Sequence, residues 1–87
     1  CSLAGAYHLG KNYAKAIQVA GSRKKTVDYG YSICLRVLAD SYSAQNNAVE
    51  TKKYMQEYLA LTDSFKEKNI FTFRDRERFQ KELENMK

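Results

Sequence analysis

The chain contains no proline, no tryptophan and only four glycines among its 87 residues. Tight turns between strands rely on glycine and proline, so this shortage argues against a β-sandwich or a β-barrel. No run of roughly eighteen apolar residues is present that could cross a membrane. A domain of this size buries only about 60% of its unfolded surface, which leaves little room for a deep catalytic cavity. The remaining expectation is one small all-α domain built from long helices.

Cysteine and histidine are also scarce. Cys1 and Cys34 allow one disulfide at most, and the apolar run around Cys34 predicts a small buried residue. His8 is the only histidine, and it lacks the partners that a nucleophilic site or a zinc site needs. We expect it to be an exposed residue near a helix end. The sequence therefore predicts no enzymatic activity, no cofactor and no metal.

The chain is basic, with 15 Lys and Arg against 10 Asp and Glu and a net charge of +5. Such a surface tolerates nucleic acid or acidic partners without requiring either. The cluster Arg23-Lys24-Lys25 could contact phosphates, but three cations give only weak, salt-dependent binding. The same cations suit the negative end of a helix dipole. Nucleic acid is therefore the less favoured partner.

The sequence begins at Cys1 and has no initiator methionine. We expect it to belong to a longer gene product, and a lipid-bearing lipoprotein start at Cys1 is the alternative. The first residues lack the basic start and apolar segment of a signal peptide. The compartment stays open, with the cytoplasm favoured over a periplasmic sensor region.

The spacing of apolar residues predicts four helices with short connections, over residues 2–10, 13–23, 27–44 and 48–62. Gly10 is expected to end the first helix in a left-handed conformation. Asn12, Thr26 and Asn47 are expected to cap the helices that follow, and Glu50 completes a capping box at Asn47.

The final segment, residues 64–87, is less regular. It holds a narrow apolar stripe at Phe79, Leu83 and Met86. The apolar residues before it, Ile70, Phe71 and Phe73, do not share its phase. The segment is thus either one offset helix that begins at a Ser64–Glu67 capping box, or a helix that restarts with Thr72 as its cap. Its interspersed cations and acids are typical of a solvated helix face.

A shift of 35 residues superposes the sequence weakly on itself. It pairs Leu3 with Leu38, Ala4 with Ala39, Tyr7 with Tyr42 and Asn12 with Asn47. The chain resembles a tetratricopeptide repeat (TPR) array, whose signature falls on Leu35, Leu38, Ala39, Tyr42, Thr51 and Met55, and before them on Leu3, Ala4, Tyr7, Ala16 and Ala20. Ala replaces the usual Gly at the close helix contact, and the terminal Pro is replaced by Asp28 and Asp63.

The resemblance implies an α-solenoid of antiparallel helix hairpins. Residues 1–26 would form a truncated first unit and residues 27–63 a second. Residues 64–87 would form a capping or connecting helix, because Arg74 would stand at the close contact of a third unit. The run at residues 58–64, followed by a charged helix, also resembles the end of TPR arrays in bacterial sensor kinases and transcription regulators.

The implied function is a non-catalytic scaffold for protein–protein interaction, part of a larger array in a bacterial signalling or regulatory protein. Its partner would be a protein or peptide; a helical nucleic-acid-associated module is the alternative. In TPR arrays the first helices of successive units line a groove, which here implies His8, Ile33, Arg36, Asp40 and Ser43. Arg36 could bind a carboxylate of a ligand, or could pair with Asp40 one turn later.

We expect the final helix to fold back on the fourth helix through Phe65, Ile70 and Phe73. The stripe formed by Phe79, Leu83 and Met86 is then expected to pack against a second copy or a neighbouring domain, because solvent-exposed apolar side chains are costly. A homodimer through this helix follows from that expectation.

Overall fold

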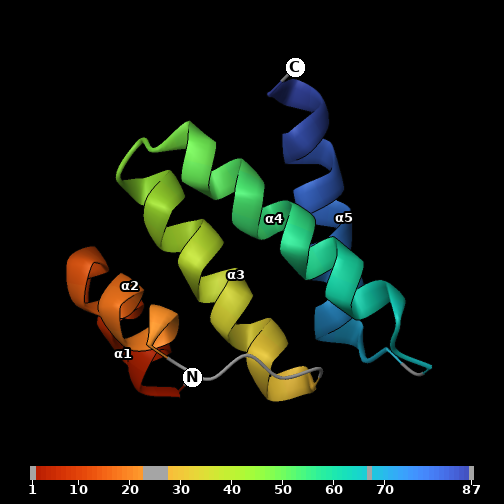
Figure 1. Ribbon diagram of the computed structural model, residues 1–87, viewed down its shortest axis with the longest axis horizontal. Helices are drawn as coiled ribbons and strands as arrows, with labels where there is room; N and C mark the ends of the chain where they lie inside the picture. Colours follow the sequence, from red (N-terminus) through yellow and green to blue (C-terminus); the bar gives the residue numbers. More distant parts are fainter. Residues whose placement is uncertain (1, 23–27, 67, 87) are drawn as a thin grey trace.

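The computed structural model describes residues 2–22, 28–66 and 68–86 and is shown in Figure 1. Within them the chain forms five helices: α1 (Ser2–Leu9), α2 (Tyr13–Gly21), α3 (Tyr29–Ala44), α4 (Ala48–Asp63) and α5 (Ile70–Asn85). No strand occurs in these described ranges. The all-α prediction is confirmed, and the bounds of the first four helices differ from the expected ones by at most two residues.

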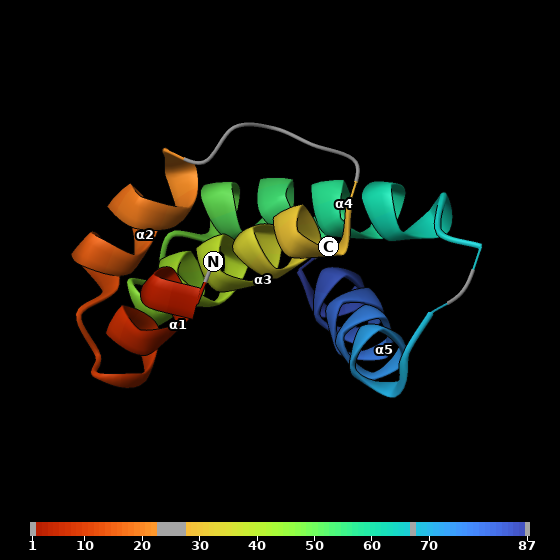
Figure 2. The same ribbon diagram turned by 90° about the horizontal axis from the view of Figure 1, so that it is seen from below.

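The helices lie in two layers. Figure 2 shows α2 and α4 on one side of the molecule and α1, α3 and α5 on the other. α3 is central, because it packs against α1, α2 and α4, whereas α5 packs mainly against α4. The arrangement leaves α1 and α5 at opposite ends of one layer, with α3 between them.

Two turns with the same backbone geometry join α1 to α2 and α3 to α4. Lys11 and Asn46, 35 positions apart in the sequence, each adopt a positive φ, of 63° and 60°. The next residue in each turn donates its backbone N–H to a tyrosine carbonyl five residues back. These bonds join Asn12 to Tyr7 at 2.8 Å and Asn47 to Tyr42 at 3.0 Å.

Asparagine side chains cap the helices that follow these two turns, as predicted. The side chain of Asn12 accepts a hydrogen bond from the backbone N–H of Lys15 at 3.4 Å, and that of Asn47 accepts one from Glu50 at 3.3 Å. The expected left-handed residue at Gly10 is wrong, because Lys11 takes that conformation. A polar residue tolerates this region at some cost in backbone energy, so the turn does not require glycine.

Two other predicted helix caps differ from those in the structure. Thr26 lies outside the described residues, and Asp28 caps α3 by accepting from the N–H of Tyr31 at 2.8 Å. Ser64 follows the last turn of α4 and caps its end, so the capping box expected there is wrong.

Asn69 caps α5, and its side chain accepts a hydrogen bond from the N–H of Thr72 at 2.9 Å. Thr72 is therefore inside the helix and is not its cap. Helix α5 begins at Ile70, between the two starting points that the sequence had left open.

The core lies where the two layers meet. Its buried apolar residues are Ala4, Ala16, Ala20, Cys34, Leu35, Val37, Leu38, Ala39, Met55, Tyr58 and Phe79. Positions 35 residues apart are buried together: Ala4 with Ala39, Ala16 with Thr51, and Ala20 with Met55. The pair Ala6 and Ser41 is an exception, since Ala6 is exposed.

Cys34 is fully buried, as the sequence predicts, and it is disulfide-bonded. The only other cysteine of the chain, Cys1, lies outside the described residues.

Phe79 anchors α5 to the rest of the chain. Its side chain is fully buried, and its ring meets that of Tyr58 edge-to-face with 5.1 Å between centroids. Leu83 and Met86 are half-buried against the same core. Phe79 has no exposed surface left for a second copy, so the expectation that its ring packs against another chain is wrong. A homodimer through Leu83 and Met86 stays a prediction.

The other apolar residues of α5 face away from α4. Ile70 and Phe73 are each 58% exposed, so the expectation that they fold back on α4 is wrong. The phase of the helix explains this, because Thr72 and Phe79 lie on one face and both are buried. Phe65 is half-buried in the connection between α4 and α5.

We predict that Ala39→Leu lowers the free energy of unfolding by about 1–3 kcal/mol, because Ala39 is fully buried and the larger side chain overpacks the core. Chemical denaturation monitored by circular dichroism measures the effect. Ala60→Leu on the exposed side of α4 is the matched control and should change little. A wild-type stability for Ala39→Leu would contradict the close packing of α3.

We predict that Phe79→Ala costs about 3–5 kcal/mol, since it removes a buried ring and leaves a cavity. Phe73→Ala changes the same residue type on the same helix, but the ring is 58% exposed and the cost should be far smaller. Thermal unfolding of both variants measures the contrast. Equal melting temperatures for the two variants would rule out the observed docking of α5.

Candidate functional site

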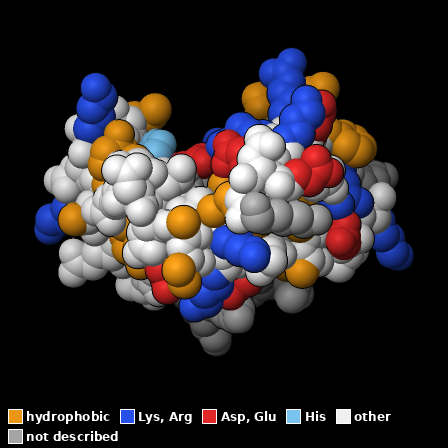
Figure 3. Space-filling model, turned by 90° about the horizontal axis from the view of Figure 1, so that it is seen from above, with side chains coloured by type: hydrophobic (Ala, Val, Ile, Leu, Met, Phe, Trp, Pro, Cys, Tyr) orange, Lys and Arg blue, Asp and Glu red, His pale blue; other side chains and the backbone are white. Residues whose placement is uncertain are grey.

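The first candidate site is a hollow over α3, bounded by α1 and α5. Figure 3 shows the molecule hollowed between its two ends, with acidic and basic side chains near the base of the hollow. All five residues expected to line a groove lie on α1 and α3: His8 on α1, and Ile33, Arg36, Asp40 and Ser43 on α3. The structure extends the site, because α5 adds charged side chains of its own.

His8 links α1 to α3. Its Nδ1 lies 3.1 Å from the Oγ of Ser41, and its ring centroid lies 5.4 Å from that of Tyr13. The residue is half-buried, so the expectation of a freely exposed histidine is wrong. Because one ring nitrogen is used in this contact, His8 serves first to hold the two helices together.

Arg36 and Asp40 pair with α5, where the sequence had suggested that they pair with each other. Asp40 accepts two hydrogen bonds from the guanidinium of Arg78, at 2.8 and 3.1 Å. The Nε of Arg36 lies 3.8 Å from a carboxylate oxygen of Asp75. Arg78 also lies 3.5 Å from Asp75 and 3.8 Å from Glu82. We call these five residues the charged cluster of the hollow.

The cluster favours the charged form of Arg78. Burial lowers the pKa of this guanidinium, but the hydrogen bond to Asp40 and the nearby carboxylates of Asp75 and Glu82 outweigh burial, and the pKa is raised. Three carboxylates face two guanidinium groups in the cluster. A ligand carboxylate entering here would therefore meet cations that are already paired.

Two predicted groove residues have other surroundings. Ile33 is half-buried and packs against the core. Ser43 is exposed at the far end of α3, where it lines a shallow pocket of about 230 Å³ with Asn46, Asn47 and Met86. The hollow therefore contains His8, Arg36 and Asp40 from the predicted set, and Ser43 belongs to the neighbouring turn.

Arg76 has a structural role that the sequence analysis missed. Its guanidinium donates to the carbonyl oxygen of Leu59 at 2.9 Å and to the Oγ1 of Thr62 at 2.6 Å, and it pairs with Asp63. It thus satisfies groups in the last turn of α4. One feature of the sequence could have indicated this role: Arg76 precedes Phe79 by three residues and therefore lies on the same face of the helix.

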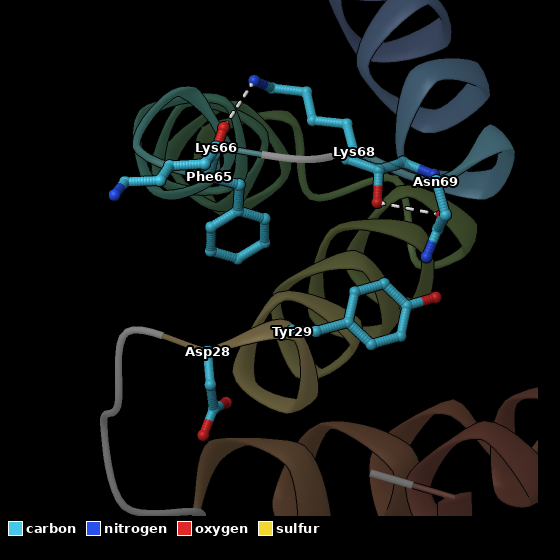
Figure 4. A pocket seen from close by; sticks show the side chains of 7 residues that line it. Asp28, Tyr29, Phe65, Lys66, Lys68 and Asn69 are labelled. Atoms are coloured by element: carbon cyan, nitrogen blue, oxygen red, sulfur yellow. Dashed lines mark hydrogen bonds between the residues drawn. The ribbon is translucent and has the colours of Figure 1, made fainter.

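A second candidate site is a cleft between the start of α3 and the connection from α4 to α5. It measures about 540 Å³ and is lined by Asp28, Tyr29, Phe65, Lys66, Lys68, Asn69 and Thr72. Figure 4 shows the rings of Phe65 and Tyr29 beside the same space, while the side chain of Lys66 extends away from the rings and that of Lys68 reaches the carbonyl of Phe65. The Nζ of Lys68 donates to the backbone carbonyl of Phe65 at 3.0 Å. Sequence reasoning missed this cleft, because its lining residues come from two stretches, 28–29 and 65–72, that lie far apart in the chain.

Tyr58 lies beneath α5, next to both Phe79 and the charged cluster. Burial raises the pKa of its hydroxyl to about 12; the negative charge of Asp75 adds to the shift, while a hydrogen bond with Thr72 opposes it. The hydroxyl therefore stays protonated over the physiological range.

The part of the chain that the structure describes holds no group of three or more His, Cys, Asp or Glu side chains placed to bind a metal ion. In the same ranges no helix has the length and apolarity needed to span a bilayer. Comparison of the chain with protein-family models, with curated proteins and with solved structures gives no match.

We predict that stability falls as the pH rises from about 10 to about 12. Unfolded Tyr58 loses its proton near the ordinary pKa of 10.0, whereas folded Tyr58 keeps it up to about 12. The folded state binds more protons in this window, so the contribution is complete below the lower value and is lost as pH passes the upper one. Denaturant unfolding at increasing pH should give a shallower decline for Tyr58→Phe. Equal declines in the two proteins would contradict the assignment.

Proposed function

We propose that this chain is a non-catalytic protein-interaction module of the TPR type, built from two helix hairpins and a closing helix. One observation carries the proposal: the two hairpin turns share their hydrogen bonds and their positive-φ residue at a spacing of 35 positions. The same spacing relates buried core residues in α1 and α3 and in α2 and α4. Repeated hairpins of this size stack into arrays that present a binding surface.

The placement of the hollow supports a binding role. α1, α3 and α5 lie in one layer, as the groove-lining helices of a TPR array do, and they frame the hollow together. A rigid frame favours binding, because less conformational freedom is lost on association. The contacts of His8 with Ser41 and of Arg78 with Asp40 tie the three helices to one another.

The charges of the hollow indicate which ligand groups it prefers. Arg36 and Arg78 are opposed by Asp40, Asp75 and Glu82, all within the charged cluster. We therefore infer that the hollow accepts neutral or cationic side chains of a protein segment better than a terminal carboxylate. The parent protein would be a bacterial signalling or regulatory protein, as the resemblance of residues 58–64 suggests.

The nucleic-acid alternative has less support. It requires basic side chains that converge on one face and remain available to phosphates. Arg76 and Arg78 instead bind carboxylates and backbone within the chain. Residues 23–25, the basic cluster seen in the sequence, lie outside the described residues.

We predict that Arg36→Glu changes peptide binding in the hollow and leaves helicity intact. The wild-type chain would be used to select binders from a random peptide library, and their affinities would be measured by fluorescence anisotropy. Reversing the charge of Arg36 removes one cation and adds a fourth carboxylate, so cationic peptides should bind about three- to tenfold more tightly. Circular dichroism checks the fold.

Arg74→Glu is the matched control, because Arg74 is exposed on α5 and belongs to neither the charged cluster nor the cleft. It makes the same change in net charge and should leave affinity nearly unchanged. The interaction proposal fails if no library peptide binds, or if duplex DNA at physiological salt binds more tightly than any peptide. Equal effects of the two substitutions would reject the hollow as the site.

A further inference from the structure

Exposed apolar side chains gather at one end of the molecule. Among the described residues, six large apolar side chains are strongly exposed: Leu9, Tyr29, Val49, Ile70, Phe71 and Phe73. Tyr29 lines the cleft, and the three at the start of α5 lie within two residues of Thr72, which also lines it. Phe71 is 62% exposed, and Ile70 and Phe73 are each 58% exposed. A concentration of this kind marks an interaction surface.

The cleft gives this apolar surface a concave centre. Tyr29 comes from the first turn of α3 and Phe65 from the connection after α4, and Figure 4 shows both rings at the edge of the same space. Thr72 is almost fully buried there. A volume of about 540 Å³ accommodates a large side chain together with part of its backbone.

The cations at the cleft differ from those in the hollow. Lys66 and Lys68 line the cleft. In the described ranges no ion pair joins either lysine to a carboxylate, whereas Arg36, Arg76 and Arg78 are all paired. Lys68 does donate to the carbonyl of Phe65.

The acids near the cleft do not cancel these cations. Asp28 also lines it, but this carboxylate accepts the N–H of Tyr31 as the cap of α3. Glu67, between the two lysines in the sequence, lies outside the described residues, and the described lining of the cleft holds two lysines and one carboxylate.

We propose that this cleft binds an acidic peptide segment that carries an aromatic or large aliphatic side chain. The apolar side chain enters between Tyr29 and Phe65, and carboxylates of the segment pair with the ammonium groups of Lys66 and Lys68. Phe71 and Phe73 extend the apolar contact beside the cleft. This inference rests on the proposed protein-interaction function and adds to it a second surface of opposite charge preference to the hollow.

The shape and charge of the site favour this occupant over others. A bilayer surface is flat and would leave a concave cleft unfilled, while a peptide side chain fills it. A second copy of the basic chain would bring more cations toward Lys66 and Lys68, with a net charge of +5 on each copy.

The test uses the whole chain and a short fluorescent peptide in which glutamates flank one phenylalanine. Two control peptides replace the glutamates by glutamine or the phenylalanine by alanine. Anisotropy titrations should show the parent peptide binding most tightly, and added salt should weaken its binding.

The double variant Lys66→Glu with Lys68→Glu should bind this peptide about five- to twentyfold more weakly, because attraction becomes repulsion at two positions. The matched control is Lys15→Glu with Lys52→Glu, which makes the same change in net charge at exposed positions of α2 and α4. It should retain nearly wild-type affinity. Phe71→Ser tests the apolar contact and should also weaken binding.

Equal weakening by the two double variants would overturn the proposal, because only net charge would then matter. Binding to phosphatidylglycerol-containing vesicles without binding to the peptide would overturn it in favour of a lipid surface. Dimerisation in sedimentation that Phe71→Ser abolishes, again without peptide binding, would overturn it in favour of a second copy. None of these outcomes concerns peptide binding in the hollow. The effect of Arg36→Glu on library peptides therefore tests the proposed function separately.

Discussion

The burial of Phe79 against Tyr58 is the contact on which the candidate sites depend. It fixes the rotation of α5 about its own axis, because a helix that buries one ring must turn every other residue to a defined direction. With Phe79 inward, Arg76 reaches the end of α4 and Arg78 reaches Asp40 on α3. The same rotation directs Ile70, Phe71 and Phe73 to the surface.

The relative strength of these contacts indicates that the burial of Phe79 orients α5 and that the ion pairs form as a result. Burying a phenylalanine stabilises a fold by about 1.5–3 kcal/mol, whereas a partly exposed ion pair contributes about 0–1 kcal/mol. The pairs of Arg78 and Arg36 are partly exposed, so they add little to the stability of the orientation that Phe79 fixes. The charged cluster is therefore a consequence of this orientation and not the interaction that holds the helix.

The sequence allowed the first four helices to be predicted well because their signals are local. Asn12 and Asn47 cap helices from within one turn, and the spacing of apolar residues repeats along each helix. The surroundings of α5 could not be predicted in the same way. Its stripe at Phe79, Leu83 and Met86 was identified, but periodicity does not say which surface covers a stripe. The cleft was missed because Tyr29 and Phe65 become neighbours only after α3 and α4 have packed.

The distribution of charge, more than its sum, distinguishes the two surfaces. A net charge of +5 suggests a uniformly basic molecule. The fold instead places Arg36 and Arg78 among three carboxylates and leaves Lys66 and Lys68 beside aromatic rings, without an ion pair in the described ranges. Paired guanidinium groups have already lost most of their attraction for an anion, while an unpaired ammonium group beside a low-dielectric surface retains it. One basic chain can thus present a hollow that disfavours carboxylates and, at the start of α3, a cleft that attracts them.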